Sequence, residues 1–268
     1  MRLGRGYSAA TRRRSAKQAE ASYGGAQAGS GYASGMFGKG VASRGASLRA
    51  AVLGANDGLV SNFSLVMGVA GGTANLDFIL LAGTAGLLAG AFSMAAGEYI
   101  SVRSQRDLYE NELRKEEVEL REWPEEEQAE LERIYRAKGL SEEESRRVAS
   151  RLMVNPEVAL DTLAREELGL DPSQLGSPVA AASSSFAAFV VGAGIPIVPY
   201  AVGIVDLAFS LSVALSGLAL LLAGGVLARL TGVNAAWGAA RMLLAGGAAA
   251  AVTHGIGRLI GVVVGNLG

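Results

Sequence analysis

A single carboxylate lies within the first long apolar stretch of the chain. Asp57 is the only charged residue in Ala50–Gly72, and the polar side chains of Asn56, Ser61 and Asn62 surround it. A carboxylate inside a membrane span costs about 2.5–3.5 kcal/mol on insertion scales, so it is a functional candidate by default. An Asp between Asn and Gly also indicates a locally irregular helix, which a membrane tolerates only where the helix lines a cavity.

A thioether and a second carboxylate follow near the end of the next apolar stretch, Phe78–Gly97. Met94 and Glu98 are four residues apart, which places both side chains on one face of a helix. A Met thioether is a soft ligand that suits Fe(II) or Cu(I) and is of little use to Mg or Ca. Taken alone, Met94 is better explained by ordinary helix packing.

Further carboxylates with helical spacing lie in the acidic region between the second and third apolar stretches. Glu116 and Glu119 share one helical face, and Glu127 and Glu130 repeat this spacing after a Trp-Pro turn. If the two helices form a hairpin, four carboxylates converge, and their mutual repulsion favours a divalent cation such as Mg, Mn or Fe(II). The alternative is a solvated acidic face, because charge runs on helices usually lie at the surface.

Five apolar stretches position these candidates. Each has about the 20 residues that an α-helix needs to cross a hydrocarbon core of roughly 30 Å. Soluble helices rarely run this long without a polar face. We therefore predict an all-α membrane protein with five transmembrane helices, from the stretches Ala50–Gly72, Phe78–Gly97, Val179–Tyr200, Ala201–Ala228 and Met242–Gly268.

Two blocks of opposite charge lie outside these stretches. Residues 1–50 hold nine Lys/Arg and one Glu, whereas residues 98–171 hold twelve Lys/Arg and twenty-one Asp/Glu. The formal net charge of −1 is therefore the result of two blocks that cancel. Because cytoplasmic flanks carry an excess of Lys and Arg, we expect the amino terminus and the acidic block in the cytoplasm and the carboxyl terminus outside.

Composition and these stretches divide the chain into four predicted regions. Residues 1–46 are rich in Gly, Ala, Ser and Arg, and such a segment forms a flexible basic tail because it buries little apolar surface. Residues 47–102 hold transmembrane helices 1–2, residues 103–172 a cytoplasmic helical subdomain, and residues 173–268 transmembrane helices 3–5. Within the subdomain, Pro124, Ser141 and Asn155 mark predicted helix starts.

The absence of Cys and the single His exclude several functions. Without Cys there are no disulfides, thiolate metal sites or Cys nucleophiles. Because His254 is alone, one chain cannot build the Glu-x-x-His pairs of a di-iron oxidase. His254 and Arg258 are four residues apart in the last apolar stretch, and a lone His in a helix is more often a packing residue than a ligand. We expect no enzymatic activity and no nucleic-acid partner.

Three motifs of this chain resemble the vacuolar iron transporter family over about residues 47–268. They are ANDGLVSN at 55–62, MAAGEYISVRSQRD at 94–107 and EELGL at 166–170. The resemblance implies five transmembrane helices in a homodimer, with a cytoplasmic metal-binding helical domain after the second. It also implies proton-coupled export of Fe(II), and often Mn(II), from the cytosol into a vacuole or out of the cell.

The resemblance further implies roles for individual residues. Asp57 and Met94 match the acid and the Met of the translocation path, and Glu98 lies near its cytoplasmic mouth. No permanently bound cofactor is implied, because Fe(II) and Mn(II) are the transported ions. Some relatives have Met shortly before the last domain glutamate, where this chain has Leu163 and Ala164. The glutamates that match the metal-binding domain are Glu116, Glu119, Glu127, Glu130 and Glu167.

Two other functions fit the same residues. A metal-binding membrane sensor or scaffold would bind ions at the acidic domain without transport, and an ion channel would conduct them without proton coupling. The carboxylate and thioether within the spans argue against a sensor. The Gly/Ala/Arg-rich composition indicates a bacterial source, and hence the cell (inner) membrane.

Overall fold

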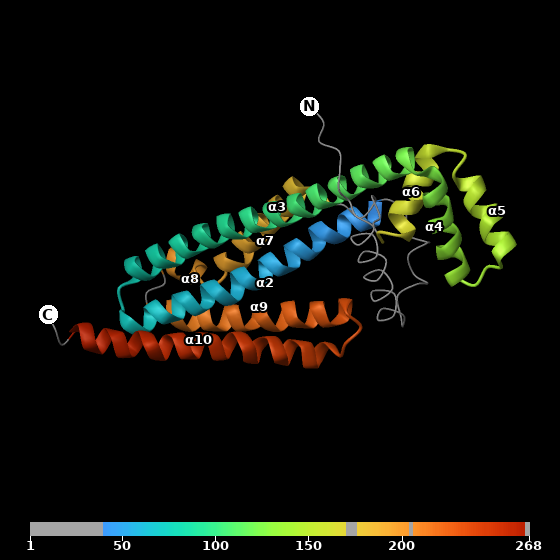
Figure 1. The fold of residues 1–268 in the computed structure, drawn as a ribbon. Helices are drawn as coiled ribbons and strands as arrows, with labels where there is room; N and C mark the ends of the chain where they lie inside the picture. The colour runs from blue at the N-terminus through green and yellow to red at the C-terminus, as the bar shows by residue number, and fades with distance from the viewer. Residues whose placement is uncertain (1–39, 170–175, 204–205, 266–268) are drawn as a thin grey trace, which may run out of the picture. The chain divides into compact units, whose positions relative to one another are not determined.

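The computed structural model describes residues 40–169, 176–203 and 206–265, and every regular element among them is an α-helix. The prediction of an all-α protein is confirmed for these residues (Figure 1). Most of the predicted tail at 1–46 lies outside the described residues, although helix α2 begins within it at Gly40. The helices of the predicted membrane body are α2 (Gly40–Gly72), α3 (Leu76–Glu122), α7 (Pro178–Gly194), α8 (Val198–Ala201), α9 (Ala208–Leu230) and α10 (Ala235–Gly265).

Among the described residues, three helices are long and apolar enough to cross a membrane: α3, α9 and the Ala235–Val263 part of α10. The predicted third span is divided, because α7 ends at Gly194 and the short helix α8 follows after Pro196. Proline lacks a backbone N–H and disfavours helical backbone in the residue before it, which explains the interruption. The fourth predicted stretch becomes helical only from Ala208.

Helix α3 runs without a break from the membrane body into the acidic block at residues 98–171. Its amino terminus is capped by Asn75, whose Oδ1 accepts hydrogen bonds from the backbone N–H groups of Asp77 at 2.9 Å and Phe78 at 3.3 Å. It continues for 47 residues to Glu122. At 1.5 Å per residue this is about 70 Å, more than twice a hydrocarbon core. The second apolar stretch therefore continues as one helix into the acidic region.

Helix α2 packs against α7, α10 and α3, and glycines allow two of these contacts. A Cβ atom on Gly192 of α7 would overlap the carbonyl oxygen of Ala55, and one on Gly257 of α10 would overlap that of Gly68. Helix backbones approach this closely in membranes where small residues line the interface. The segment of α2 that carries Asp57 is therefore held directly against α7.

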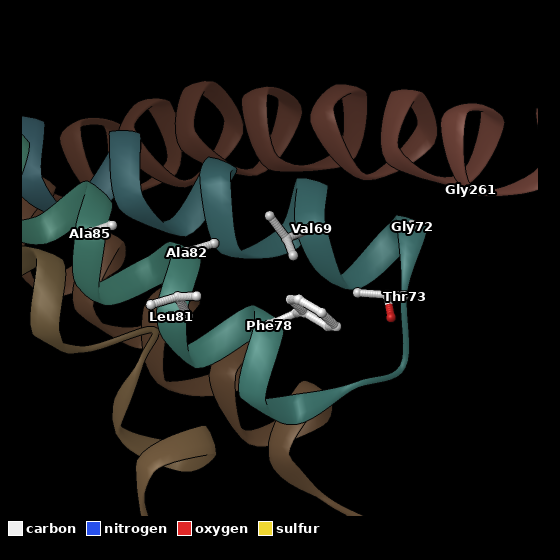
Figure 2. A pocket seen from close by; sticks show the side chains of 8 residues that line it. All are labelled: Val69, Gly72, Thr73, Phe78, Leu81, Ala82, Ala85 and Gly261. Atoms are coloured by element: carbon white, nitrogen blue, oxygen red, sulfur yellow. The ribbon is translucent and has the colours of Figure 1, made fainter. Parts of the chain in front are cut away.

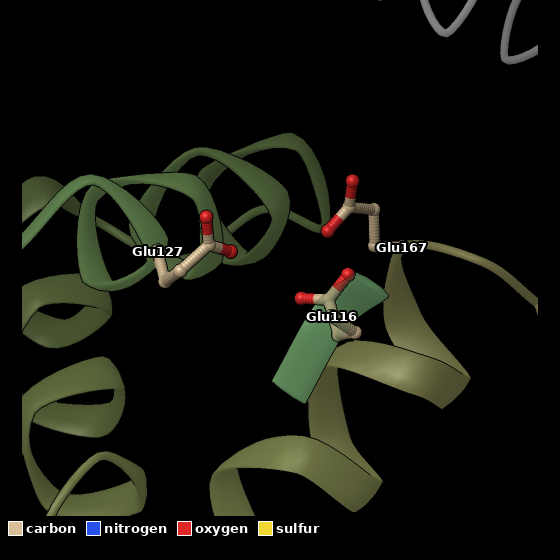
Figure 3. A group of neighbouring side chains, drawn as sticks. All are labelled: Glu116, Glu127 and Glu167. Carbon is tan, nitrogen blue, oxygen red and sulfur yellow. The ribbon is translucent and has the colours of Figure 1, made fainter. Parts of the chain in front are cut away.

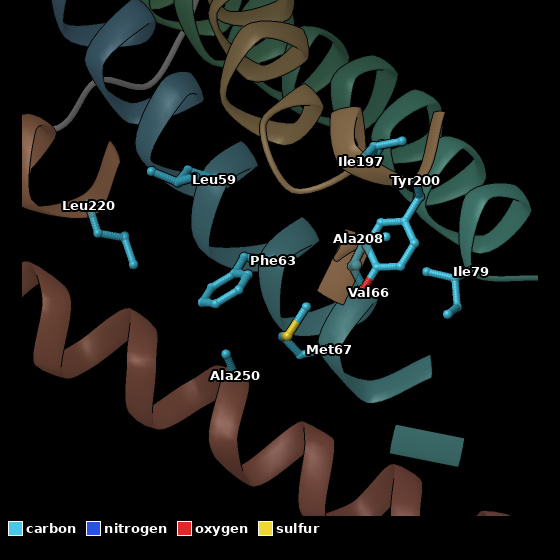
Figure 4. Close-up of a cluster of buried hydrophobic side chains, with 10 residues drawn as sticks. All are labelled: Leu59, Phe63, Val66, Met67, Ile79, Ile197, Tyr200, Ala208, Leu220 and Ala250. Carbon is cyan, nitrogen blue, oxygen red and sulfur yellow. The ribbon is translucent and has the colours of Figure 1, made fainter. Parts of the chain in front are cut away.

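The main hydrophobic core forms around α2 (Figure 4). Large apolar side chains on the outer faces of α3, α9 and α10 are instead exposed, for example Leu81, Phe92, Leu222 and Leu259. Such an exposed apolar surface fits contact with lipid. The buried residues of the core are Leu59, Phe63, Val66, Met67, Ile79, Ile197, Tyr200, Ala208, Leu220 and Ala250.

Three short amphipathic helices follow α3: α4 (Pro124–Ala137), α5 (Glu142–Leu152) and α6 (Pro156–Glu166). All three begin at the predicted positions. Ser141 and Glu144 form a capping box at the start of α5, and Asn155 caps α6 by accepting a hydrogen bond from the N–H of Glu157. Leu131, Ala149 and Leu163 are fully buried between these helices and form a small core of their own.

Candidate functional site

Three glutamates converge where α3, α4 and α6 meet (Figure 3). Glu116 comes from α3, Glu127 from the first turn of α4, and Glu167 caps the carboxyl end of α6. One carboxylate oxygen of each lies within 4.8 Å of the others. The side chains of Glu116 and Glu127 are buried, with only 3% and 7% of the residue surface exposed. We call these three residues the glutamate cluster.

The small core of the acidic helices explains why these carboxylates meet. Residues four apart on a helix lie on the same face, one turn from each other. Each member of the glutamate cluster is four residues from an apolar side chain in or against this core, and these side chains are Leu120, Leu131 and Leu163. Packing of the leucines therefore directs the three carboxylates toward one point.

Burial and mutual repulsion raise the pKa of all three carboxyl groups. Burial is the largest cause for each, and the neighbouring glutamates add to it. The pKa of Glu116 rises from 4.5 to about 8, and the pKa values of Glu127 and Glu167 rise to about 7. The hydrogen bond between Glu116 and Glu127 raises the pKa of Glu116 and lowers that of Glu127.

One oxygen of Glu116 is buried and has no hydrogen-bond partner within the described part of the chain. A buried polar atom without a partner costs free energy, and a bound cation removes that cost. Three converging carboxylates suit a hard or borderline divalent ion. Leu163 and Ala164 are fully buried and offer no ligand atom, so the donors of the cluster are oxygens.

Glu119 and Glu130, the other two predicted domain ligands, lie beside the cluster rather than in it. Glu119 is exposed on α3, and Glu130 pairs with Arg133 at 3.3 Å. Both carboxylates are close enough to raise the pKa of Glu167 through repulsion. The structure thus brings three of the five predicted glutamates into one group and leaves two at its edge.

A second candidate site lies in the membrane body, where Asp57 and Met94 line a common cavity of about 270 Å³. The cavity lies between α2, α3 and α7, and Asn62, Gly86 and Phe189 also line it. The Oγ atom of Ser61, another lining residue, donates a hydrogen bond to the Asp57 carbonyl oxygen at 2.5 Å. The structure therefore brings together the predicted acid and thioether from two helices.

Glu98 does not line this cavity and lies one helical turn beyond Met94 on α3. Its Oε1 atom is 3.2 Å from the Nη2 atom of Arg49 on α2. Sequence reasoning assigned Arg49 only to the basic amino-terminal block. Its position directly before the first apolar stretch was the available signal that it lies near the end of that helix, where Glu98 of α3 meets it.

The larger cavity of about 640 Å³ lies near the other end of α2 and is apolar (Figure 2). Val69, Phe78 and Leu81 are among its lining residues, and no charged side chain of the described residues lines it. It therefore does not suit an ion. His254 packs nearby in α10, where its Nδ1 donates to the Met67 carbonyl oxygen at 3.0 Å, as expected of a packing residue.

Comparison with known proteins agrees with these features. The sequence pattern of the VIT family matches residues 48–258. The chain is 40% identical over 223 residues to "Vacuolar iron transporter" of Acanthamoeba castellanii, covering 79% of this chain and 78% of that protein. It is 34% identical over 217 residues to "Vacuolar iron transporter 2" of Oryza sativa subsp. japonica, covering 81% and 88%. The chain therefore belongs to the VIT family, a family of membrane iron transporters and not of enzymes.

Proposed function

We propose that this protein exports Fe(II), and also Mn(II), from the cytosol in exchange for protons. It acts as a homodimer in a bacterial cell membrane, with its amino terminus in the cytoplasm and its carboxyl terminus outside. The observation that carries this proposal is the shared cavity of Asp57 and Met94 within the membrane body of an iron transporter. A carboxylate and a thioether together suit a borderline ion such as Fe(II) better than Mg or Ca.

In this proposal five helices span the membrane: α2, α3, α7, α9 and α10. Helix α7 has 17 residues, or about 25 Å, and with the following turn and α8 it approaches the thickness of a hydrocarbon core. Helix α2 is long enough to span, and its only charge between residues 50 and 72 is Asp57. The acidic helices then lie in the cytoplasm.

The glutamate cluster collects ions from the cytosol in this mechanism. Glu116 and Glu98 lie on the same continuous helix, separated by 18 residues, or about 27 Å of α3. An ion released from the cluster moves along α3 to Glu98, then to Met94 one turn further, and reaches Asp57 in the cavity. Glu119 and Glu130 act as additional carboxylates that attract cations to the cluster.

Proton coupling follows from the chemistry of the carboxylates. A carboxylate binds either a metal ion or a proton, so the two compete for the same oxygen atoms. A proton that enters from the outside displaces the ion from Asp57. The Asp57 carboxyl group then releases this proton to the cytosol and becomes an ionised carboxylate again. Neither step requires a bound cofactor.

Flux into proteoliposomes tests this proposal. The full-length protein is reconstituted, and uptake of Fe(II), Mn(II), Co(II) and Zn(II) is measured with and without an imposed pH gradient. Asp57→Ala should abolish flux with the protein still folded, whereas Asp107→Ala, which removes an exposed α3 carboxylate paired with Arg103, should not.

Three outcomes would contradict the proposal. Wild-type flux from Asp57→Ala would exclude the assigned path. Flux that is independent of the pH gradient would indicate a channel. Binding of ions by the wild-type protein without any flux would indicate a sensor or scaffold.

A further inference from the structure

Asn62 is a buried amide on α2 whose orientation is fixed by its contact with α7. Only 2% of its surface is exposed, and its Nδ2 donates a hydrogen bond to the carbonyl oxygen of Ala193 at 2.7 Å. Ala193 lies in the last turn of α7, where carbonyl groups lack helical donors. A carbonyl oxygen only accepts, so the amide nitrogen must face α7 and Oδ1 must face away from it.

The Oδ1 atom of Asn62 faces Gly86 on α3. It lies 2.9 Å from the position that a Cβ atom on Gly86 would occupy, and both residues line the cavity. It is buried and has no hydrogen-bond partner within the residues that the structure describes. A buried oxygen in this state costs free energy unless a donor or a cation approaches it.

The surroundings favour a cation over a hydrogen-bond donor. The other polar groups that line the cavity are the Asp57 carboxylate and the Met94 thioether, which accept but do not donate when the carboxylate is ionised, and the hydroxyls of Ser61 and Ser93. The Ser93 hydroxyl makes no hydrogen bond to Oδ1. The hydroxyl of Ser61 already donates to a backbone carbonyl. Amide oxygens are ordinary ligands for divalent ions, to which they add no charge.

We propose that Asn62 Oδ1 is a third ligand of the transported ion, beside Asp57 and Met94. This inference rests on the proposed function, because it takes the cavity to be part of the ion path. A neutral oxygen strengthens binding without a second negative charge, so the ion can still leave the site. The glycine at position 86 is required because a side chain there would crowd the oxygen.

The ligand role predicts a change in ion preference as well as in affinity. Mn(II) depends more on oxygen ligands than Fe(II), which the thioether also holds. Loss of Oδ1 should therefore raise the KM for Mn(II) about tenfold, the effect of losing one favourable contact to a charged group. The KM for Fe(II) should rise less, so the Mn(II)/Fe(II) ratio of kcat/KM should fall.

Two variants, one on α2 and one on α3, test whether Oδ1 of Asn62 binds the ion. Asn62→Ala removes the oxygen together with the bond to Ala193. Gly86→Ala keeps that bond and places a methyl group against Oδ1. Both should show the raised KM for Mn(II) and the lower Mn(II)/Fe(II) ratio in proteoliposome flux.

Matched controls separate this role from helix packing. Gly97→Ala makes the same substitution on α3 at a position where a Cβ atom meets no described atom within 4 Å. Ser64→Ala removes another buried oxygen without a described partner from α2, outside the cavity lining. Both controls should keep the wild-type ion ratio.

The results distinguish the ligand role of Asn62 from the proposed transport function. If Asn62→Ala and Gly86→Ala keep the wild-type ion ratio while Asp57→Ala is inactive, the ligand role of Asn62 is wrong. The proposed ion path through Asp57 then still stands. If Asn62→Ala only lowers the melting temperature and Gly86→Ala transports normally, Asn62 is a packing residue and the ligand role is again wrong. If Asp57→Ala transports normally, the proposed function itself fails.

Discussion

Arg49 and Glu98 form an ion pair that joins α2 to α3, with 3.2 Å between Nη2 and Oε1. The Glu98 side chain is 14% exposed, whereas the Arg49 side chain is 58% exposed. Glu98 is one turn from Met94, so the guanidinium holds the carboxylate that the proposed path reaches before the cavity. On the proposed path, an arriving ion would compete with this guanidinium for Glu98.

Arg49→Gln should therefore lower the KM for metal flux several-fold, because the ion no longer competes with a guanidinium for Glu98. The loss in stability should stay below about 1 kcal/mol, as for other ion pairs with an exposed partner. Concentration-dependent uptake into proteoliposomes measures the KM. Arg103→Gln is the control, since Arg103 pairs with Asp107 within α3 at 2.9 Å. An unchanged or higher KM in Arg49→Gln would show that the pair does not compete with the ion.

Glu116→Gln should weaken metal binding to the cytoplasmic helices by at least tenfold. The substitution keeps the shape of the side chain but removes the most buried carboxyl group of the glutamate cluster, and each 1.4 kcal/mol of lost binding is a factor of ten. Titration calorimetry on the full-length protein with Mn(II) measures the affinity. Glu125→Gln, at an exposed position in the first turn of α4, should bind as the wild-type protein does. Equal losses in both variants would mean that general negative charge, not the cluster, binds the ion.

The raised pKa values predict that the metal-free protein loses stability as pH rises. The folded state holds protons on Glu116, Glu127 and Glu167 up to about pH 7–8, whereas the unfolded chain releases them near 4.5. Between these values the folded state binds more protons, so the free energy of unfolding decreases with increasing pH. Thermal unfolding of the detergent-solubilised protein between pH 5 and pH 8 measures this trend.

Mn(II) should reverse the trend, since ionised carboxylates bind the metal and stabilise the folded state through that binding. Binding near pH 7 should also release protons, which appear as a dependence of the binding enthalpy on the buffer. Glu116→Gln should show a smaller loss of stability with pH. A metal-free stability that increases over this range would contradict the assigned pKa shifts.

Gly192→Ala should separate α2 from α7 beside Asp57. The added methyl group would overlap the carbonyl oxygen of Ala55 and lie 3.0 Å from the backbone nitrogen of Leu59, and both atoms belong to a rigid helix. Overpacking of this kind costs typically 1–3 kcal/mol, so the melting temperature and the metal flux should both fall. Gly194→Ala, two residues later, meets no described atom within 4 Å and should behave as the wild type. Equal melting temperatures in the two variants would disprove the close contact.

Helix boundaries and the all-α class could be predicted from the sequence because they depend on short-range interactions. Ser141 and Glu144 form their capping box across three residues, and the Asn155 cap acts over two. The lengths of the apolar stretches can likewise be read directly from the sequence. The interruption of the third stretch was also present in the sequence at Pro196, but the apolar composition on both sides of this residue obscured it.

The composition of each site was decided by contacts that spacing does not reveal. Helical spacing treats Glu116 and Glu119 as equivalent, yet only Glu116 faces the core that Leu131 and Leu163 form. Glu167 joins the cluster because the packing of α6 on α3 and α4 brings its carboxylate there, and before the structure only the family resemblance indicated it.

The sequence by itself determined which residues could bind a metal ion and that apolar helices must carry some of them through a membrane. Only the tertiary structure decided the direction of individual atoms. Asn62 turns its oxygen toward Gly86 because a carbonyl 131 residues away takes its amide hydrogen, and Arg49 meets Glu98 across 49 residues. Such contacts depend on the packing of α2 against α7 and α3, and no local pattern specifies that packing.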